Sequence, residues 1–213
     1  QTFMKEKSNS DKDIFRKLIK SVERFSEEDI DYLMEDLDNW GFFIMPASCR
    51  KHGCFEGGLV KHSINVCKIA QMLRSQMIQE RPDLERMLPM DSVIIVSLLH
   101  DVCKSDIYQK VCKRQKNEIG IWENVTSYGT NYSNLPVGHG EKSVIMLLRS
   151  GLDLTDEEIL AIRWHMGSWD IAYQSQEMIA SHNKSREITP LVTLIHAADS
   201  LAADLIERPY CTL

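Results

Sequence analysis

The segment DSVIIVSLLHDV, residues 91–102, decides which fold this sequence can adopt. Only Ser92 and Ser97 interrupt its apolar run before His100. A helix this apolar has no face suited to water, so it must lie at the centre of a domain. The sequence therefore predicts helices packed around residues 91–102, and this central helix ends on two polar residues, His100 and Asp101.

Helical spacing of apolar residues continues through most of the chain, which predicts an all-α helical bundle. In the longest expected helix, for example, Val66, Ile69 and Leu73 share one face. Ser26 and Thr155 are expected N-caps, because acidic residues fill the turns that follow them. The expected helices cover residues 11–22, 27–39, 59–79, 91–102, 139–150, 155–166 and 190–207, with a short helical piece between Pro82 and Pro89.

Three segments lack this helical spacing. Residues 40–58 and 167–189 are predicted to be loops, the second with a helical turn or two. Residues 111–132 alternate in character and contain two glycines, which predicts one small β-hairpin. We expect residues 1–45 to form an N-terminal helical appendage and residues 46–213 to form the main domain.

The composition argues against two classes of partner. The chain has 213 residues, a formal net charge of −6 and no long Lys/Arg run, which disfavours binding of extended nucleic acid but permits a small phosphate ligand. Its apolar runs are too short for a membrane span, and its polar N-terminus does not resemble a signal peptide. None of the six cysteines forms a C-x-x-C pair, so we expect free thiols and a cytoplasmic protein. Nothing in the sequence predicts an oligomeric state.

Several histidines and aspartates fall on the apolar faces of the expected helices. Taken singly, each has a structural explanation, as a hydrogen-bonded core histidine or a capping residue. Together they would make an expensive core, because a buried carboxylate without a partner costs several kcal/mol. Mixed imidazole and carboxylate ligands suit a divalent metal such as Mn, Fe, Zn or Ni. The candidates are His62, His100, Asp101, His139, His165 and Asp199.

Three motifs of this chain follow one another in a recognisable order. They are Gly57-Gly58-Leu59-Val60-Lys61-His62-Ser63, then Leu98-Leu99-His100-Asp101-Val102-Cys103-Lys104, and finally His196-Ala197-Ala198-Asp199. This order resembles the H…HD…D ligand pattern of the HD-domain superfamily of metal-dependent phosphohydrolases, over about residues 46–207. Residues 138–143 (GHGEKS) and 161–167 (AIRWHMG) are also similar to the HD domain that follows an oligonucleotide-binding module in some bacterial 3′-to-5′ exoribonucleases.

The resemblance implies an all-α fold and hydrolysis of phosphate esters. It also implies that His62, His100, Asp101 and Asp199 bind a divalent metal, which could be Mn, Fe, Ni, Zn or Mg. Branches of the superfamily with two ions add histidines between the HD pair and the last aspartate. His139 and His165 occupy those places, so one or two ions are expected.

In the enzymatic interpretation, Asp101 and Lys104 are the catalytic residues. Asp101 could bridge two metals, and Lys104 could neutralise phosphate charge or simply offset a helix dipole. Lys142, near an expected helix start, could also meet phosphate, but we expect it to be solvated.

Arg163, Trp164 and Trp169 are candidates to line the pocket, although core packing is the safer prediction for both tryptophans. The predicted substrate is a phosphomonoester or phosphodiester of a small molecule, with a nucleotide preferred. A ligand-sensing HD module and an exoribonuclease-like enzyme acting on RNA remain the alternatives.

Overall fold

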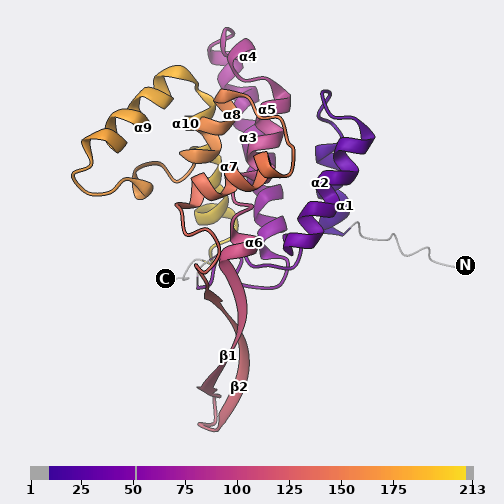
Figure 1. Ribbon diagram of the computed structural model, residues 1–213, viewed down its shortest axis with the longest axis vertical. Coiled ribbons are helices and arrows are strands. Elements are labelled where there is room, and N and C mark those ends of the chain that lie inside the picture. The colour runs from indigo at the N-terminus through magenta and orange to yellow at the C-terminus, as the bar shows by residue number, and fades with distance from the viewer. Residues whose placement is uncertain (1–9, 51, 210–213) are drawn as a thin grey trace, which may run out of the picture.

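A computed structural model describes residues 10–50 and 52–209, and most of these residues are helical (Figure 1). The elements, in chain order, are α1 (Asp11–Ile19), α2 (Glu27–Trp40), α3 (Gly58–Glu80), α4 (Leu84–Met87), α5 (Met90–Leu99), α6 (Lys104–Ile107), β1 (Tyr108–Lys116), β2 (Trp122–Thr130), α7 (His139–Arg149), α8 (Asp156–Arg163), a 3-10 turn η1 (Gly167–Asp170), α9 (Gln176–Ile188), α10 (Leu191–Leu201) and a π-helical turn η2 (Ala202–Ile206). The predicted fold, mainly helical with one small hairpin, is confirmed.

The apolar helix α5 lies at the centre of the molecule, as its sequence predicts. Every residue from Ser92 to Leu99 is buried. Helices α3, α8, α10 and α1 all pack against it, and α3 also packs along α10. A helix that is apolar on all sides is stable only when neighbouring helices cover all of it, so α5 fixes the layout of the bundle.

The N-terminal helices share the main core. Phe15 of α1 makes edge-to-face contacts with Phe42 and Phe43, which follow α2. The N-cap predicted at Ser26 is present as a capping box with Asp29. Because Phe15 and Phe42 belong to the same apolar cluster as α3 and α5, the first helices are packed onto the domain; a boundary near residue 45 stays a prediction.

A buried glutamate joins three parts of the bundle. Glu158 lies in the first turn of α8, and its side chain is fully buried. Its carboxylate accepts hydrogen bonds from Ser92 of α5 (2.7 Å), from the Thr155 backbone N–H (2.9 Å) and from the Arg24 guanidinium (2.7 Å). The capping box predicted at Thr155 is therefore also a junction between α8, α5 and the segment that joins α1 to α2.

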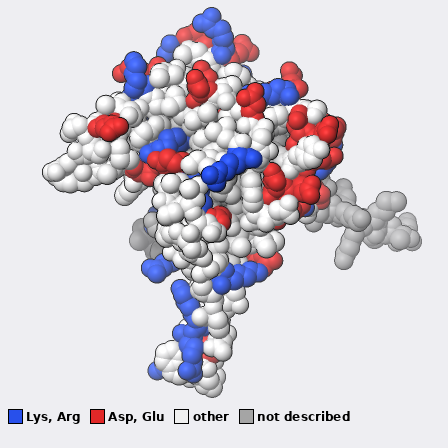
Figure 2. All heavy atoms as spheres, in the orientation of Figure 1, with Lys and Arg blue, Asp and Glu red and all other residues white. Residues whose placement is uncertain are grey.

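The hairpin β1–β2 projects away from the helical body (Figure 1). Its antiparallel register pairs Tyr108 with Thr130 and Lys116 with Trp122, slightly earlier in the chain than predicted. At its base, the N–H of Asn131 donates to the carbonyl oxygen of Ile107 (2.7 Å), so the chain leaves and re-enters the domain at adjacent points. In Figure 2, basic side chains follow the hairpin, whereas acidic ones gather over α1 and α2.

The prediction that residues 167–189 form a loop is wrong, because α9 occupies 13 of those residues. Ser175 caps the helix by accepting the N–H of Met178 (3.3 Å). The inward positions are Met178, His182 and Ser185, at helical spacing. Since two of the three are polar, a search for apolar periodicity could not detect the helix.

Lys142 also differs from its prediction. It is buried rather than solvated, with 3% of its side chain exposed. The ammonium forms an ion pair with Asp106 and donates to the carbonyl oxygen of Asn134 (2.5 Å). A buried lysine needs such partners, and here they tie the start of α7 to α6.

Within residues 10–50 and 52–209, no single helix has the length and apolar character of a membrane span. One pair of consecutive helical segments, Gln176–Ile188 and Leu191–Ile206, meets those two criteria jointly, but it is bent by 103°.

The five described cysteines are free thiols that differ in exposure, Cys49 being intermediate, and Cys211 lies outside the described residues. Cys54 and Cys112 are exposed, whereas Cys67 and Cys103 are buried. Burial raises the pKa of both buried thiols, that of Cys103 to about 12.

Because the thiolate is the nucleophile, we expect iodoacetamide at pH 8 to label Cys54 and Cys112 and to leave Cys67 and Cys103 unmodified until denaturant is added. Peptide mass spectrometry measures this, and rapid labelling of Cys103 in the native protein would contradict the fold around it.

Candidate metal centre

Four side chains from three helical segments converge at one point in the core. His62 comes from α3, His100 and Asp101 follow α5, and Asp199 lies on α10. His62 Nε2 lies 3.0 Å from Asp199 Oδ1 and 3.7 Å from Asp101 Oδ2. His100 Nε2 lies 3.3 Å from Asp101 Oδ2 and 4.0 Å from Asp199 Oδ1. The four residues that the sequence assigns to one cation are thus in mutual contact.

The adjacent pair His100-Asp101 can face one point because the helix ends there. Neighbours within a helix point about 100° apart. Helix α5 ends at Leu99, and a turn separates it from α6. His100 is further fixed by its Nδ1–H, which donates to the carbonyl oxygen of Ser97 (2.9 Å).

His165 joins the same cluster from the turn after α8. Its Nε2 lies 3.3 Å from Asp101 Oδ1, on the other side of that carboxylate from His62. Its Nδ1–H donates to the carbonyl oxygen of Ile162 (2.7 Å). The His100 and His165 rings lie edge to face with centroids 4.8 Å apart, so both offer Nε2 toward Asp101.

His139 lies at the first residue of α7, close to Asp101 from a further direction. A nitrogen of His139, the thiol of Cys103 and a carboxylate oxygen of Asp101 lie within 4.8 Å of one another. His139 and His165 therefore both approach Asp101, as a second-ion arrangement requires. Cys103 is a neighbour of the site that the sequence pattern does not mark.

The cluster contains polar atoms that make no hydrogen bond within the described part of the chain. They are the Nε2 atoms of His62, His100 and His165 and the Oδ1 atom of Asp101, all fully shielded from solvent. Buried polar atoms are normally hydrogen-bonded. These atoms instead lie 3.0–3.7 Å from neighbouring atoms of the cluster without an aligned hydrogen bond, as donor atoms around a shared ligand would. Imidazole nitrogens and carboxylate oxygens are donors for a borderline divalent cation, so these residues fit a metal ion.

The charged side chains of the cluster stabilise one another. Burial alone would lower the pKa of His62, but the carboxylates of Asp199 and Glu207 outweigh it and raise that pKa to about 9. Burial alone would raise the pKa of Asp101, yet Lys104 and His100 hold it well below its usual range. Both carboxylates at the centre are ionised, because the pKa of Asp199 is also lowered against burial, mainly by His62.

Lys104 contacts the cluster directly. Its Nζ lies 2.5 Å from Asp101 Oδ2, and 9% of its side chain is exposed. Burial opposes the charge, but Asp101 raises the pKa of Lys104, so the ammonium stays protonated. The helix-dipole explanation considered for Lys104 is therefore replaced by a direct ion pair with the central carboxylate.

A cavity of about 480 Å³ opens onto this cluster. Trp169 lies on its wall with 89% of its surface exposed, so core packing is the wrong prediction for this residue. Trp164 is buried as expected, under the guanidinium of Arg163, and neither of these two lines the cavity. The lining residues are His52, Lys104, His165, Met166, Trp169, His196, Asp199, Ser200, Ala203 and Asp204.

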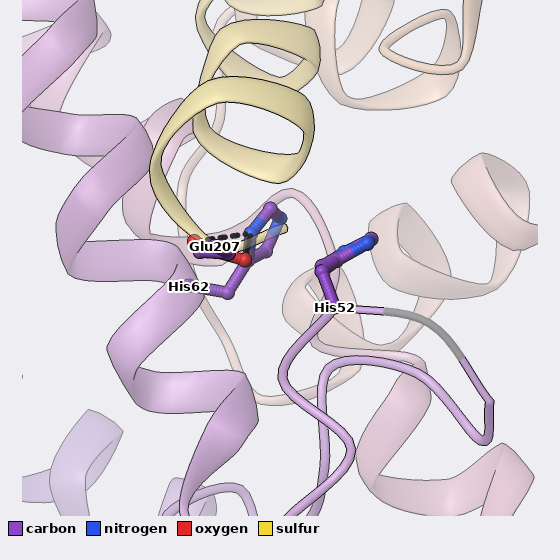
Figure 3. Close-up of side chains that lie close together, drawn as sticks. All are labelled: His52, His62 and Glu207. Atoms are coloured by element: carbon purple, nitrogen blue, oxygen red, sulfur yellow. Dashed lines mark hydrogen bonds and ion pairs between the residues drawn. The ribbon is translucent and has the colours of Figure 1, made fainter. Parts of the chain in front are cut away.

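Two residues near the cluster escaped sequence analysis, His52 and Glu207 (Figure 3). Both oxygens of Glu207 face His62 Nδ1, at 3.0 and 3.1 Å, and the His52 ring centroid lies 5.0 Å from that of His62. Extending the spacing of α10 predicts that Ile206 faces the core, but Ile206 is 62% exposed. The π-helical turn η2 adds one residue per turn at this point, so Glu207 takes the inward position instead.

Comparison with protein families gives one result. The family model described as HD domain matches residues 59–204, which include His62, His100, Asp101 and Asp199. No curated protein and no solved structure shows a significant match.

Proposed function

Because this chain belongs to the HD-domain family, whose members are generally metal-dependent hydrolases, we propose that it hydrolyses a phosphomonoester or phosphodiester of a small molecule, and that this molecule is a nucleotide. The observation that carries the proposal is the set of buried Nε2 and carboxylate atoms around Asp101 that converge without an aligned hydrogen bond. His62, His100, Asp101 and Asp199 would hold the first ion. A bound divalent cation supplies a water of lowered pKa and neutralises charge on the phosphoryl group.

The chain's own residues have separate tasks in this proposal. The Nδ1–H bonds of His100 and His165 to backbone carbonyl oxygens fix each ring with Nε2 toward Asp101. Lys104 lines the cavity, and its ammonium group keeps its positive charge. In this proposal it contacts the phosphate oxygens of the substrate. Burial keeps bulk water from His62, His100, Asp101 and His165.

The substrate class is supported by the cavity. Its volume of about 480 Å³ falls in the range of small-molecule sites. The exposed Trp169 ring on its wall offers a flat surface on which a nucleobase can stack. The net charge of −6 supplies little attraction for a long polyanion.

An RNA substrate is the second candidate, favoured by one observation. The exposed residues Lys113, Arg114 and Lys116 give strand β1 a local concentration of positive charge. This would agree with the resemblance to the HD domain of exoribonucleases.

A hydrolysis screen tests the proposal. Phosphomonoesters, nucleotides and cyclic nucleotides would be incubated with the protein and Mn²⁺, Fe²⁺, Ni²⁺, Zn²⁺ or Mg²⁺ in turn. We expect metal-dependent release of phosphate or of a nucleoside monophosphate. Shortening of single-stranded RNA with no action on small esters would favour the second candidate, and stable ligand binding without turnover would favour a sensing module.

The second ion gives a separate prediction. Replacing His139 and His165 together with alanine should halve the metal content, because the first ion keeps its four ligands while the second loses both histidines. Metal content of protein purified without chelators, measured by inductively coupled plasma mass spectrometry, checks this. A matched control is His182→Ala, a buried histidine that contacts Trp164 instead of Asp101. Unchanged stoichiometry in the double variant would leave a one-ion site.

A further inference from the structure

The three buried histidines around Asp101 hold their Nδ1 atoms in different ways. His100 and His165 each donate to a backbone carbonyl oxygen three residues earlier in their own segment. His62 instead meets a carboxylate from a different part of the chain, with both oxygens of Glu207 within 3.1 Å of Nδ1 (Figure 3). His62 is therefore the one of these three histidines whose Nδ1 contacts a charged side chain.

Glu207 is itself held in place from both sides. Its backbone N–H donates to the carbonyl oxygen of Ala202 (3.0 Å), which closes the π-helical turn. Its Oε1 accepts a hydrogen bond from Asn65 Nδ2 (3.0 Å), and Asn65 lies one turn after His62 on α3. Only 9% of the Glu207 side chain is exposed. The carboxylate thus has a fixed position between α3 and the end of α10.

We propose that Glu207 is a positioning residue of the metal centre: with Asn65, it fixes the His62 ring with its proton on Nδ1 and its Nε2 lone pair directed at the ion. A carboxylate behind a ligating imidazole fixes its orientation and makes it a stronger donor. The inference rests on the proposed metal site. Glu207 lies three residues beyond the segment that matches the family model, so the match itself does not include it.

The arrangement makes a quantitative prediction about metal affinity. Glu207→Ala should weaken Mn²⁺ binding about 10- to 100-fold, the range found when such a partner of a ligand is removed. Glu207→Gln should lose less, because the amide oxygen can still accept the Nδ1–H. Asn65→Ala should also lose less, because the carboxylate remains but is free to rotate.

Isothermal titration calorimetry with MnCl₂ measures these affinities, and thermal unfolding of the metal-free proteins measures any structural effect. The control is Glu187→Ala, which removes an exposed carboxylate from α9 that pairs with Lys184. A merely structural role would lower the unfolding temperature of metal-free Glu207→Ala and leave Mn²⁺ affinity unchanged, which would overturn the inference. Wild type that binds no Mn²⁺ would overturn the metal site as well. If Glu207→Ala does not fold, the Mn²⁺ affinities of Glu207→Gln and Asn65→Ala decide. Affinities below that of wild type support the inference, and affinities equal to it overturn the inference.

Discussion

Replacing Asp101 with asparagine should reduce phosphate-ester hydrolysis by about 10³-fold or more. Asp101 lies between His62, His100 and His165, so one substitution would remove a carboxylate that is available to both proposed ions. Stabilisation of phosphoryl charge by a metal is worth several kcal/mol, and about 4 kcal/mol corresponds to a factor of 10³. The measurement is kcat/KM on the best substrate of the screen, together with metal content.

The neighbouring lysine must be considered in this experiment. Asp101→Asn leaves Lys104 buried without its counter-ion, and loss of one partner of a buried pair costs about 3–5 kcal/mol of stability. The double variant Asp101→Asn/Lys104→Met removes both charges, so it should recover stability while staying inactive. Urea unfolding of both variants separates misfolding from lost chemistry. Full activity and metal content in a folded Asp101→Asn variant would contradict the assignment of the centre.

Replacing Glu158 with alanine should lower the free energy of unfolding by about 3 kcal/mol, because it removes a buried carboxylate together with the hydrogen bonds that this carboxylate accepts. The substitution strands the Ser92 hydroxyl in the core and removes the acceptor of the Thr155 N–H. An unsatisfied buried hydroxyl costs about 1–3 kcal/mol, and a lost cap costs about 1 kcal/mol. The ion pair between Glu158 and Arg24 contributes less to the free energy of unfolding than these two losses, because the Arg24 side chain is 32% exposed.

Urea unfolding followed by circular dichroism at 222 nm gives this energy. The matched control is Glu157→Ala, one residue earlier in the same turn, where the side chain is exposed and only a few tenths of a kcal/mol of dipole interaction are lost. In a Ser92→Ala/Glu158→Ala double variant, the free energy of unfolding should fall by clearly less than the sum of the two single losses, because the stranded hydroxyl is gone. Equal losses in Glu157→Ala and Glu158→Ala would show that the buried junction contributes nothing.

The sequence predicted the centre of the molecule well, because apolar spacing reports burial. The apolar run at residues 91–102 and the helical positions of His62 and Asp199 were enough to expect a bundle with polar residues inside. The pair His100-Asp101 could be predicted for the same reason, because the apolar run ends where helix α5 ends. In each case the pattern of neighbours along one helix carried the information.

What the sequence did not reveal depends on contacts between distant segments. Helix α9 buries histidine and serine, so it carries little apolar signal. The burial of Lys142 depends on Asp106 and on a backbone carbonyl group, neither of which lies on its own helix. Glu207 reaches His62 only because the helix widens by one residue at η2, and no composition rule marks that change.

The base of the hairpin has a consequence for how such a chain can vary. Asp101 and His139 are held near each other by contacts outside the hairpin: the Cys103 N–H donates to Ser143 Oγ (3.2 Å), and Lys142 pairs with Asp106. The distance between these residues in space is therefore independent of the number of residues between them in sequence. The hairpin is therefore a position at which the chain can be lengthened, shortened or exchanged for another module while the geometry of the candidate metal centre stays unchanged.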